Sequence, residues 1–285
     1  MIQLIECPRD AMQGLDEFIP TQQKIDYINQ LLKVGFHTID FGSFVSPKAI
    51  PQMRDTAEVL AGLDLDDQSA ELLAIVANTR GAKDACSFKE VDYLGYPFSI
   101  SETFQLRNTN ATIQDSVERL HRITNLAYSN DKKMVVYISM GFGNPYGDEW
   151  NADIVKHWVD ELILMGVEII SLSDTIGVAN PESISYLFGD LIPIYPEITF
   201  GAHLHTRPQD WKEKVEAAYQ QGCRRFDGAL KGFGGCPMAK DDLTGNMAME
   251  NLIHYFDEVE EDINIDREAF LDSMNLASKV FPIHD

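Results

Sequence analysis

The chain has 285 residues, of which 45% are hydrophobic and 24% are charged, and its formal net charge at pH 7 is −22. This length suits one large α/β domain or two small ones, each with a full core. The negative charge repels polyphosphate surfaces and argues against a nucleic-acid partner. No run of about 18 apolar residues occurs and no basic leader precedes Ile2, so we expect neither a membrane span nor a secretory signal.

The four cysteines are scattered along the chain without the Cys-x-x-Cys spacing that is typical of zinc knuckles. They are Cys7, Cys86, Cys223 and Cys236. Their distribution indicates no disulfide framework and fits a reducing compartment. Because no leader precedes the first apolar run either, we expect a cytoplasmic location.

Short apolar runs alternate with amphipathic segments along the chain. The runs predict eight β-strands, at residues 2–6, 38–42, 72–77, 93–99, 134–139, 168–172, 199–205 and 225–230. Six segments between them repeat their apolar positions with the helical period of 3.6 residues, at residues 21–34, 52–63, 111–128, 153–165, 181–191 and 208–221. This alternation predicts βαβ units and a parallel sheet.

Eight such units point to an α/β fold of one kind, the (β/α)₈ or TIM barrel. Barrels of this type have about 250 residues, so eight units and additional C-terminal helices use the whole chain. We therefore predict a single TIM-barrel catalytic domain over residues 1–285. The strongly acidic stretch at residues 257–266 is predicted to be a solvated loop.

Polar side chains follow most of the predicted strands, where the reaction site of such a barrel lies. They include Arg9, Asp10, Gln13, Asp40, Ser43, Glu102, Ser139, Asp174, Thr175, His203, His205 and Asn246. Carboxylate, imidazole and amide donors with few sulfurs suit Mg²⁺ or Mn²⁺, with zinc as the weaker candidate.

His203 and His205 are the strongest local signal for a metal. They lie two residues apart on a predicted strand and therefore point to the same side of it. Two ordinary histidines on a half-buried strand are the alternative interpretation. The polar residues at the other strand ends favour a metal.

Five motifs carry a family resemblance, in the same order, from about residue 2 to residue 255. They are Cys7-Pro-Arg-Asp10-Ala-Met-Gln13, Ser43-Phe-Val-Ser-Pro-Lys48 with Pro51-Gln-Met53, Ser173-Asp-Thr-Ile-Gly177, His203-x-His205 and Gly232-Phe-Gly-Gly-Cys-Pro237. They resemble those of 3-hydroxy-3-methylglutaryl-CoA (HMG-CoA) lyases, within the metal-dependent barrel lyases and Claisen-type synthases. The resemblance implies retro-Claisen cleavage of a 3-hydroxyacyl thioester of the HMG-CoA kind to acetyl-CoA and a keto acid, acetoacetate.

The resemblance also assigns the metal ligands, which fall on Asp10, His203, His205 and Asn246. It implies that a divalent metal holds the tertiary hydroxyl and a neighbouring carboxylate of the substrate and acidifies the hydroxyl. A base near Asp10 or His203 would then remove the hydroxyl proton, and the sequence leaves both open.

Further catalytic roles follow from the same resemblance. Arg9 would stabilise the enolate that forms at the thioester. Cys236, on a glycine-rich loop, would protonate the enolate carbon or assist its protonation. Asp40 is a further catalytic candidate, and the expected substrate contacts are Gln13, Ser139, Thr175 and Glu102.

Several positions depart from the family pattern and indicate a divergent member. Asp40 stands where the family usually has Glu, one methylene longer, and Thr206-Arg207 replaces an Asp that follows the second histidine. Lys231 replaces a small residue before the glycine run. An acidic protein also needs local cations for the phosphates of CoA, and Lys48, Arg80 and Arg107 are the candidates.

Alternatives stay open for individual residues. Arg9 and Asp10 could form a surface ion pair, Asn246 could be a helix cap, and Glu102 and Asp174 could be structural acceptors at strand ends.

Two other functions compete with the lyase. One is a condensing acyltransferase of the isopropylmalate or citramalate synthase type, although such synthases carry further C-terminal regions. The other is a non-catalytic metal- or acyl-binding barrel. In each case the expected partner is a small acyl-CoA or hydroxy acid, and a homodimer is expected by resemblance.

Overall fold

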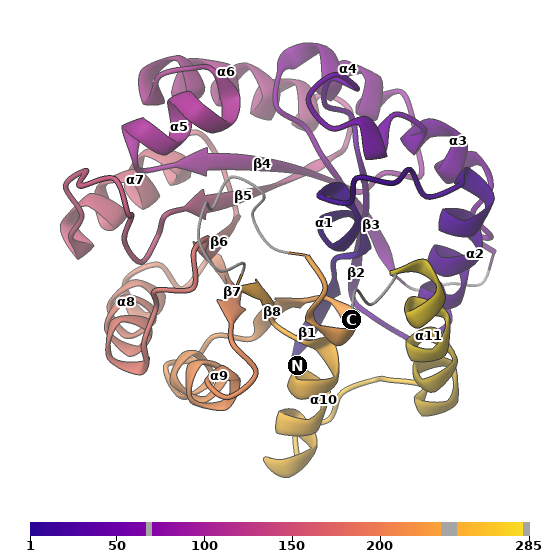
Figure 1. Ribbon diagram of the computed structural model, residues 1–285. Coiled ribbons are helices and arrows are strands. Elements are labelled where there is room, and N and C mark those ends of the chain that lie inside the picture. Colours follow the sequence, from indigo (N-terminus) through magenta and orange to yellow (C-terminus); the bar gives the residue numbers. More distant parts are fainter. Residues whose placement is uncertain (67–69, 235–243, 282–285) are drawn as a thin grey trace.

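The computed structural model describes residues 1–66, 70–234 and 244–281, and eight parallel strands form a closed barrel at its centre (Figure 1). Each strand pairs with its neighbour in chain order, and β1 pairs with β8 to close the ring. The strands are β1 Gln3–Glu6, β2 Thr38–Ser43, β3 Glu71–Ile75, β4 Tyr93–Ser99, β5 Lys133–Ser139, β6 Ile169–Asp174, β7 Thr199–Thr206 and β8 Arg225–Gly228. The predicted TIM barrel is confirmed.

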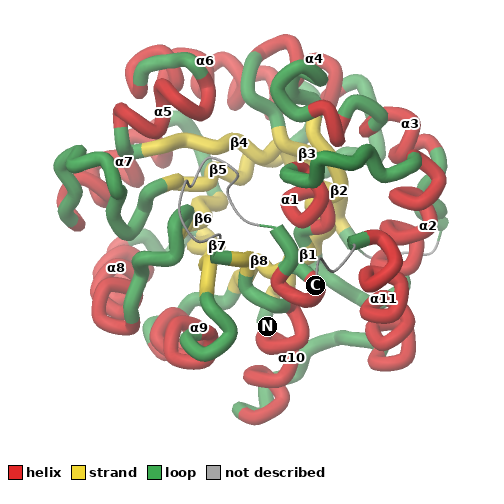
Figure 2. The backbone as a smooth tube through the Cα atoms, viewed as in Figure 1, coloured by secondary structure: helices red, strands yellow, loops and turns green. Residues whose placement is uncertain are grey.

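A ring of helices surrounds the strands on the outside (Figure 2). The α-helices are α1 Pro8–Gln13, α2 Thr21–Leu32, α3 Thr56–Ala61, α4 Thr79–Cys86, α5 Glu102–Thr109, α6 Ile113–Tyr128, α7 Ala152–Leu164, α8 Pro181–Ile194, α9 Trp211–Gln220, α10 Met249–Glu258 and α11 Arg267–Val280. Two short 3₁₀ helices, η1 Pro51–Met53 and η2 Leu230–Gly232, complete the set. The last two α-helices are the predicted C-terminal addition.

The predicted helices differ from the observed ones in two respects. The segment 52–63 divides into η1 and α3, and where the two meet the Thr56 hydroxyl lies within hydrogen-bonding distance of the backbone oxygens of Met53 and Ser43. Three short helices were not predicted: α1, α4 and α5 span only six to eight residues, too few to show the helical period. In the acidic stretch 257–266, residues 257 and 258 are the last two residues of α10, and the remaining residues form a loop after that helix.

Alternate residues of each strand point to opposite faces of the sheet, and in β3 to β6 they divide between two hydrophobic cores. Outward-facing side chains join the large core between sheet and helices. The barrel interior holds a separate small cluster, mainly from β3 to β6, made of Leu73, Ile75, Tyr93, Val135, Tyr137 and Ile169. On β7 and β8 the corresponding inward positions carry His203, Arg225 and Asp227 instead, so one side of the interior is polar.

None of the helices within the described ranges is long and apolar enough to cross a membrane. The assignment of residues 1–285 to one catalytic domain stays a prediction.

Candidate active site

The short helix α1 carries the first three site residues at the carboxyl end of β1. Pro8 begins this helix, where its missing N–H costs nothing. Arg9 Nη1 donates to Asp10 Oδ1 at 3.1 Å and to Gln13 Oε1 at 2.8 Å, and Gln13 Nε2 donates to Asp10 Oδ1 at 2.5 Å. In Figure 1, α1 lies inside the helix ring, next to β2.

Asp40, at the inward side of β2, holds the other edge of the Arg9 guanidinium. Arg9 Nε lies 3.0 Å from Asp40 Oδ2 and Nη2 lies 2.5 Å from the same oxygen. Arg9, Asp10 and Asp40 are 7%, 8% and 1% exposed, so the ion pairs that Arg9 forms with Asp10 and with Asp40 are both buried and neither is a surface ion pair. Burial raises the pKa of Asp40 to about 6, and the charge and hydrogen bonds of Arg9 oppose this rise.

His203 and His205 project from β7 into the same space as Asp10. One donor atom from each of the three lies within 4.8 Å of the others, and the two imidazole centroids are 5.4 Å apart. Burial and the neighbouring His203 lower the pKa of His205 to about 4, so its imidazole is neutral, the form that binds metals.

Asn246 reaches this cluster from β9 Gly245–Asn246, which pairs antiparallel with β7 so that Asn246 lies opposite His205. Its Nδ2 donates to Asp10 Oδ2 at 2.7 Å and to the Phe233 carbonyl at 2.9 Å. Helix α10 begins three residues later with Ala248 as its N-cap, so Asn246 does not cap that helix. All four predicted ligands therefore come together.

These residues fit a divalent cation. His205 Nδ1 is buried and has no hydrogen-bond partner among the described residues, and a buried polar atom without a partner is costly unless it binds something. One carboxylate, two imidazoles and one amide oxygen form a donor set of mixed nitrogen and oxygen type, without sulfur. This is a possible metal-binding site.

Sequence reasoning missed Asp227, which lies on β8 and contacts His203 of the cluster inside the barrel. Its Oδ2 accepts a hydrogen bond from His203 Nδ1 at 3.0 Å. Burial lowers the pKa of His203, but the hydrogen bond and charge of Asp227, with the charge of Asp10, outweigh burial and raise it. An available signal was the acidic residue in the apolar run at residues 225–230, at an inward position of the two-residue period.

The structure separates the remaining substrate candidates into two groups. Ser139 and Thr175 are buried at the ends of β5 and β6, and the Thr175 hydroxyl accepts from the Met140 backbone N–H at 2.9 Å. The Glu102 carboxylate instead accepts from the Ile113 N–H at the start of α6, at 3.0 Å. Asp174 is turned outward, where it pairs with Lys214 at 2.9 Å. The last two contacts are those of structural acceptors.

The other candidates lie at the surface or outside the described ranges. Lys48, Arg80 and Arg107 are exposed, and the guanidinium carbon of Arg107 lies 4.7 Å from the centre of the Tyr146 ring. Cys236 lies outside the described residues.

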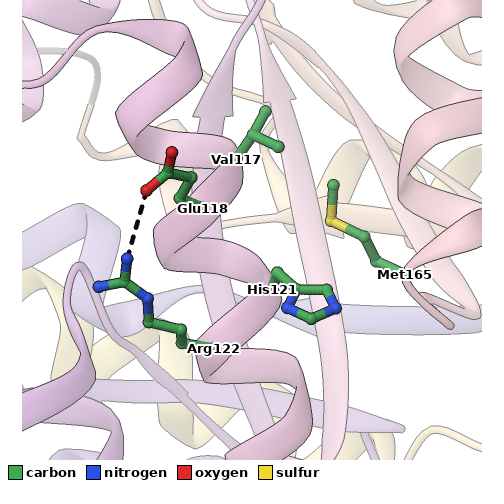
Figure 3. Close-up of a pocket in the computed structure, with 5 residues that line it drawn as sticks. All are labelled: Val117, Glu118, His121, Arg122 and Met165. Carbon is green, nitrogen blue, oxygen red and sulfur yellow. Dashed lines mark hydrogen bonds and ion pairs between the residues drawn. The ribbon is translucent and has the colours of Figure 1, made fainter.

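A cavity of about 300 Å³ on the helix ring is separate from this cluster. Figure 3 shows its lining residues, four from α6 and one after α7, namely Val117, Glu118, His121, Arg122 and Met165. None of them is a residue of the cluster, and the only contact drawn is the Arg122–Glu118 ion pair at 3.3 Å. The possible metal site therefore lies at the strand ends, apart from this cavity.

A closed (β/α)₈ barrel that brings an aspartate, two histidines and an asparagine together at its strand ends defines a barrel enzyme with a possible metal centre. The particular family follows from comparison with known proteins. The chain belongs to the HMGL-like family, whose family model matches residues 2–276.

Relatives agree with this membership in sequence and in structure. The chain is 31% identical to the hydroxymethylglutaryl-CoA lyase YngG of Bacillus subtilis over 264 residues, 93% of this chain and 87% of that protein. It is 32% identical to the 3-hydroxy-3-isohexenylglutaryl-CoA/hydroxymethylglutaryl-CoA lyase of Pseudomonas aeruginosa, covering 95% and 90% of the two chains. The predicted resemblance is confirmed.

Among solved structures, an HMG-CoA lyase from Acinetobacter baumannii in complex with coenzyme A and 3-methylmalate superposes with a TM-score of 0.91. That protein is 31% identical to this chain, and the match covers 98% of this chain and 91% of that one. The HMG-CoA lyase of Brucella melitensis gives the same TM-score at 28% identity, with 98% of each chain covered.

Proposed function

We propose that this protein cleaves HMG-CoA, or a close 3-hydroxyacyl thioester, into acetyl-CoA and acetoacetate or the corresponding keto acid. The observation that carries the proposal is the convergence of Asp10, His203, His205 and Asn246 beside the buried guanidinium of Arg9. Family membership and the lyase names of the relatives support the same reaction.

Arg9 is suited to stabilise the negative charge that develops on the thioester oxygen. A guanidinium has five N–H donors. Asp40 takes the Nε donor and one from Nη2, while Asp10 and Gln13 take both from Nη1. Within the described part of the chain this leaves one Nη2 donor for the substrate, and the anchored side chain needs no reorganisation when charge develops.

Bond cleavage requires a proton to leave the tertiary hydroxyl and another to reach the carbon that is released. A base in the neighbourhood of Asp10 or His203 takes the hydroxyl proton. The carbon–carbon bond breaks as the hydroxyl carbon becomes a ketone, and the electron pair passes into the thioester enolate beside Arg9. Cys236 supplies or assists the second proton transfer, which gives the acetyl thioester.

Mg²⁺ or Mn²⁺ is the proposed ion, with zinc less favoured, because the donor set is rich in nitrogen and oxygen and leaves room for substrate oxygens. When bound, such an ion would polarise the substrate hydroxyl and lower its pKa. Asp10, His203, His205 and the Asn246 amide oxygen would hold it.

Gln13, Ser139 and Thr175 are the proposed contacts for the acyl part of the substrate. For the phosphates of CoA we propose Lys48, Arg80 and Arg107, exposed cations on a chain whose net charge is −22. Loss of one such cation should raise KM for the thioester and leave kcat nearly unchanged, because it acts far from the reacting atoms.

The reaction is tested with purified protein, Mg²⁺ or Mn²⁺, and HMG-CoA, with acetyl-CoA as the measured product. Turnover that a chelator abolishes and fresh metal restores supports the proposal. Arg9→Met should remove turnover, whereas the exposed Arg122→Met on α6 is the matched control and should retain it. The isohexenylglutaryl thioester belongs in the same assay, since one relative is named for it.

Two other outcomes distinguish the competing functions. Consumption of acetyl-CoA together with a 2-keto acid would identify a condensing synthase and overturn the lyase. Metal binding without turnover of any hydroxyacyl thioester would identify a binding barrel. A homodimer and a cytoplasmic location stay predictions, and relatives named as cytoplasmic and as mitochondrial both match the chain.

A further inference from the structure

Asp227 and His203 face each other across neighbouring strands inside the barrel. They are register partners in the pairing of β7 with β8, so both side chains point to the interior at the same height. Asp227 Oδ2 lies 3.0 Å from His203 Nδ1, and the Asp227 side chain is 1% exposed. The contact is fixed by strand register and does not depend on a loop.

This hydrogen bond decides which ring nitrogen carries the proton. An ionised carboxylate can only accept, so Nδ1 of His203 must donate. The neutral imidazole then has its lone pair on Nε2, the form in which that nitrogen can bind a cation. The Tyr137 ring meets the imidazole edge-on, at 5.5 Å between centroids and 80° between planes, and limits its rotation.

Asp227 is not part of the metal cluster itself. Two groups of mutually close donor atoms occur within the described ranges, one of Asp10, His203 and His205, the other of Cys7, His203 and Asp227, and only His203 belongs to both. His203 therefore belongs to the possible metal site and also contacts the carboxylate of Asp227.

Cys7 does not turn the lower group into a second metal site. Burial, and then the charges of Asp227, Asp40, Asp10 and Glu6, raise the pKa of the Cys7 thiol well above its usual value. His203 Nδ1 donates to Asp227 Oδ2 and so offers no lone pair to an ion on this side, and the Cys7 Sγ is within hydrogen-bonding range of the Ile5 carbonyl, at 3.7 Å. Cys7 therefore packs as a small buried side chain.

We propose that Asp227 is a positioning residue that holds His203 in the tautomer and orientation needed to bind the divalent cation. The inference rests on the metal site of the proposed function and adds to it a residue that touches neither metal nor substrate. Asp227 Oδ1 has no hydrogen-bond partner among the described residues. Asp227 Oδ2 lies 3.0 Å from His203 Nδ1 and 3.5 Å from Ser171 Oγ, so the contact with His203 is the shorter of the two.

The test measures Mn²⁺ affinity without substrate, by electron paramagnetic resonance of free Mn²⁺ and by calorimetry. Asp227→Asn keeps the shape but replaces one carboxylate oxygen with an N–H₂ donor, which favours the wrong tautomer. We expect Mn²⁺ affinity to fall about 10- to 100-fold, the usual loss when an outer partner of a metal-bound histidine is removed. Cys7→Ser should leave the affinity unchanged.

Asp55→Asn is the matched control, because Asp55 is also buried and pairs with Lys24 at 2.7 Å outside the barrel. It should lower stability and leave Mn²⁺ affinity unchanged. Equal Mn²⁺ affinity of Asp227→Asn and the wild-type protein would overturn the positioning role. A loss of Mn²⁺ affinity in Cys7→Ser would also overturn it, because it would make Cys7, His203 and Asp227 a set of metal ligands.

The outcomes also separate this inference from the proposed function. A wild-type protein that binds no Mn²⁺ would overturn both. A wild-type protein that binds Mn²⁺ but cleaves no thioester would overturn only the proposed lyase activity, and the affinity of Asp227→Asn would still decide the role of Asp227.

Discussion

Arg9 and Asp40, 31 residues apart in sequence, form a buried pair in which the carboxylate accepts from both Nε and Nη2 of the guanidinium. This geometry fixes the plane of the guanidinium. The remaining Nη2 donor is thereby held in one direction.

Asp40→Asn should lower kcat/KM about 100-fold, because the amide loses the charge that anchors Arg9 and a displacement of about one ångström is enough for that loss. Metal affinity should stay unchanged, since Asp40 is not among the proposed ligands. Steady-state kinetics and Mn²⁺ titration measure the two effects. The exposed Asp26→Asn is the matched control, and unchanged kcat/KM in Asp40→Asn would contradict the role of the pair.

His205→Ala should empty the metal site. It removes an imidazole whose Nδ1 is buried without a partner in the described part of the chain, and the loss of affinity should exceed the 10- to 100-fold that is typical of outer contacts. Elemental analysis of dialysed protein measures metal content. His121→Ala, on the exposed face of α6, is the control.

Cys236→Ala should retain the metal and lose turnover, because its proposed role is proton transfer to the enolate. Metal content and acetyl-CoA release are measured on the same sample. Loss of metal in this variant would make Cys236 a ligand and would contradict the role that the sequence predicts for it.

Glu6→Gln should stabilise the protein at neutral pH. The Glu6 carboxylate is fully buried; its Oε1 accepts from the Leu230 N–H at 3.0 Å, and Oε2 has no partner within the described ranges. Burial raises the pKa of Glu6 well above its usual value, the Leu230 hydrogen bond opposes this, and the charge of Glu250 adds to it. A neutral amide of the same shape avoids the cost of a buried charge.

The pH dependence has a definite sign. Unfolded Glu loses its proton near pH 4.3, whereas folded Glu6 keeps its proton to higher pH, so over that interval the folded state binds more protons. The free energy of unfolding therefore falls as pH rises, by about 1.4 kcal/mol for each pH unit, until the folded pKa is passed.

Urea denaturation at several pH values measures the free energy of unfolding of the wild-type protein and of Glu6→Gln, with the exposed Glu58→Gln as control. The advantage of Glu6→Gln should shrink as the pH approaches 4. An advantage that grows on acidification would refute the assignment.

Arg225→Met should also stabilise the protein. Arg225 is 1% exposed inside the barrel, and its three guanidinium nitrogens have no hydrogen-bond partner among the described residues. A buried charge without a partner costs free energy, so an apolar side chain of similar size should raise the free energy of unfolding. Arg225→Lys keeps the charge and should bring no gain. Lower stability of Arg225→Met in chemical denaturation would show that the guanidinium has a partner such as buried water.

The sequence alone could predict the barrel and the four residues of the possible metal site. The alternation of apolar runs with amphipathic segments predicted the barrel, and the rule that strand ends carry the site selected Asp10 among other polar residues. The two-residue period put His203 and His205 on the same side of a strand. Two short helices were not predicted: α4 begins at the Asn78 cap and α5 at the Ser101 cap, and each spans only eight residues, fewer than the window in which a helical period can be recognised.

Side-chain direction at the strand ends needed the tertiary structure. Ser173 and Asp174 are neighbours in one polar motif, yet Asp174 lies opposite Leu204 on the outward face and meets Lys214 of α9. Glu102 follows β4, and its carboxylate accepts from the Ile113 N–H at the start of α6. A polar residue after a strand can point either way, and the packing of the next helix decides which.

The chain by itself determined which chemical groups are present and at which end of the barrel they gather, because local periodicity and residue type are written in consecutive residues. Only the closed sheet decided the partners: Asp227 for His203, and Asp40 for Arg9. The His203–Asp227 pair arises from the register between β7 and β8, and the Arg9–Asp40 pair from the packing of α1 against β2. Both are set by the packing of the whole barrel.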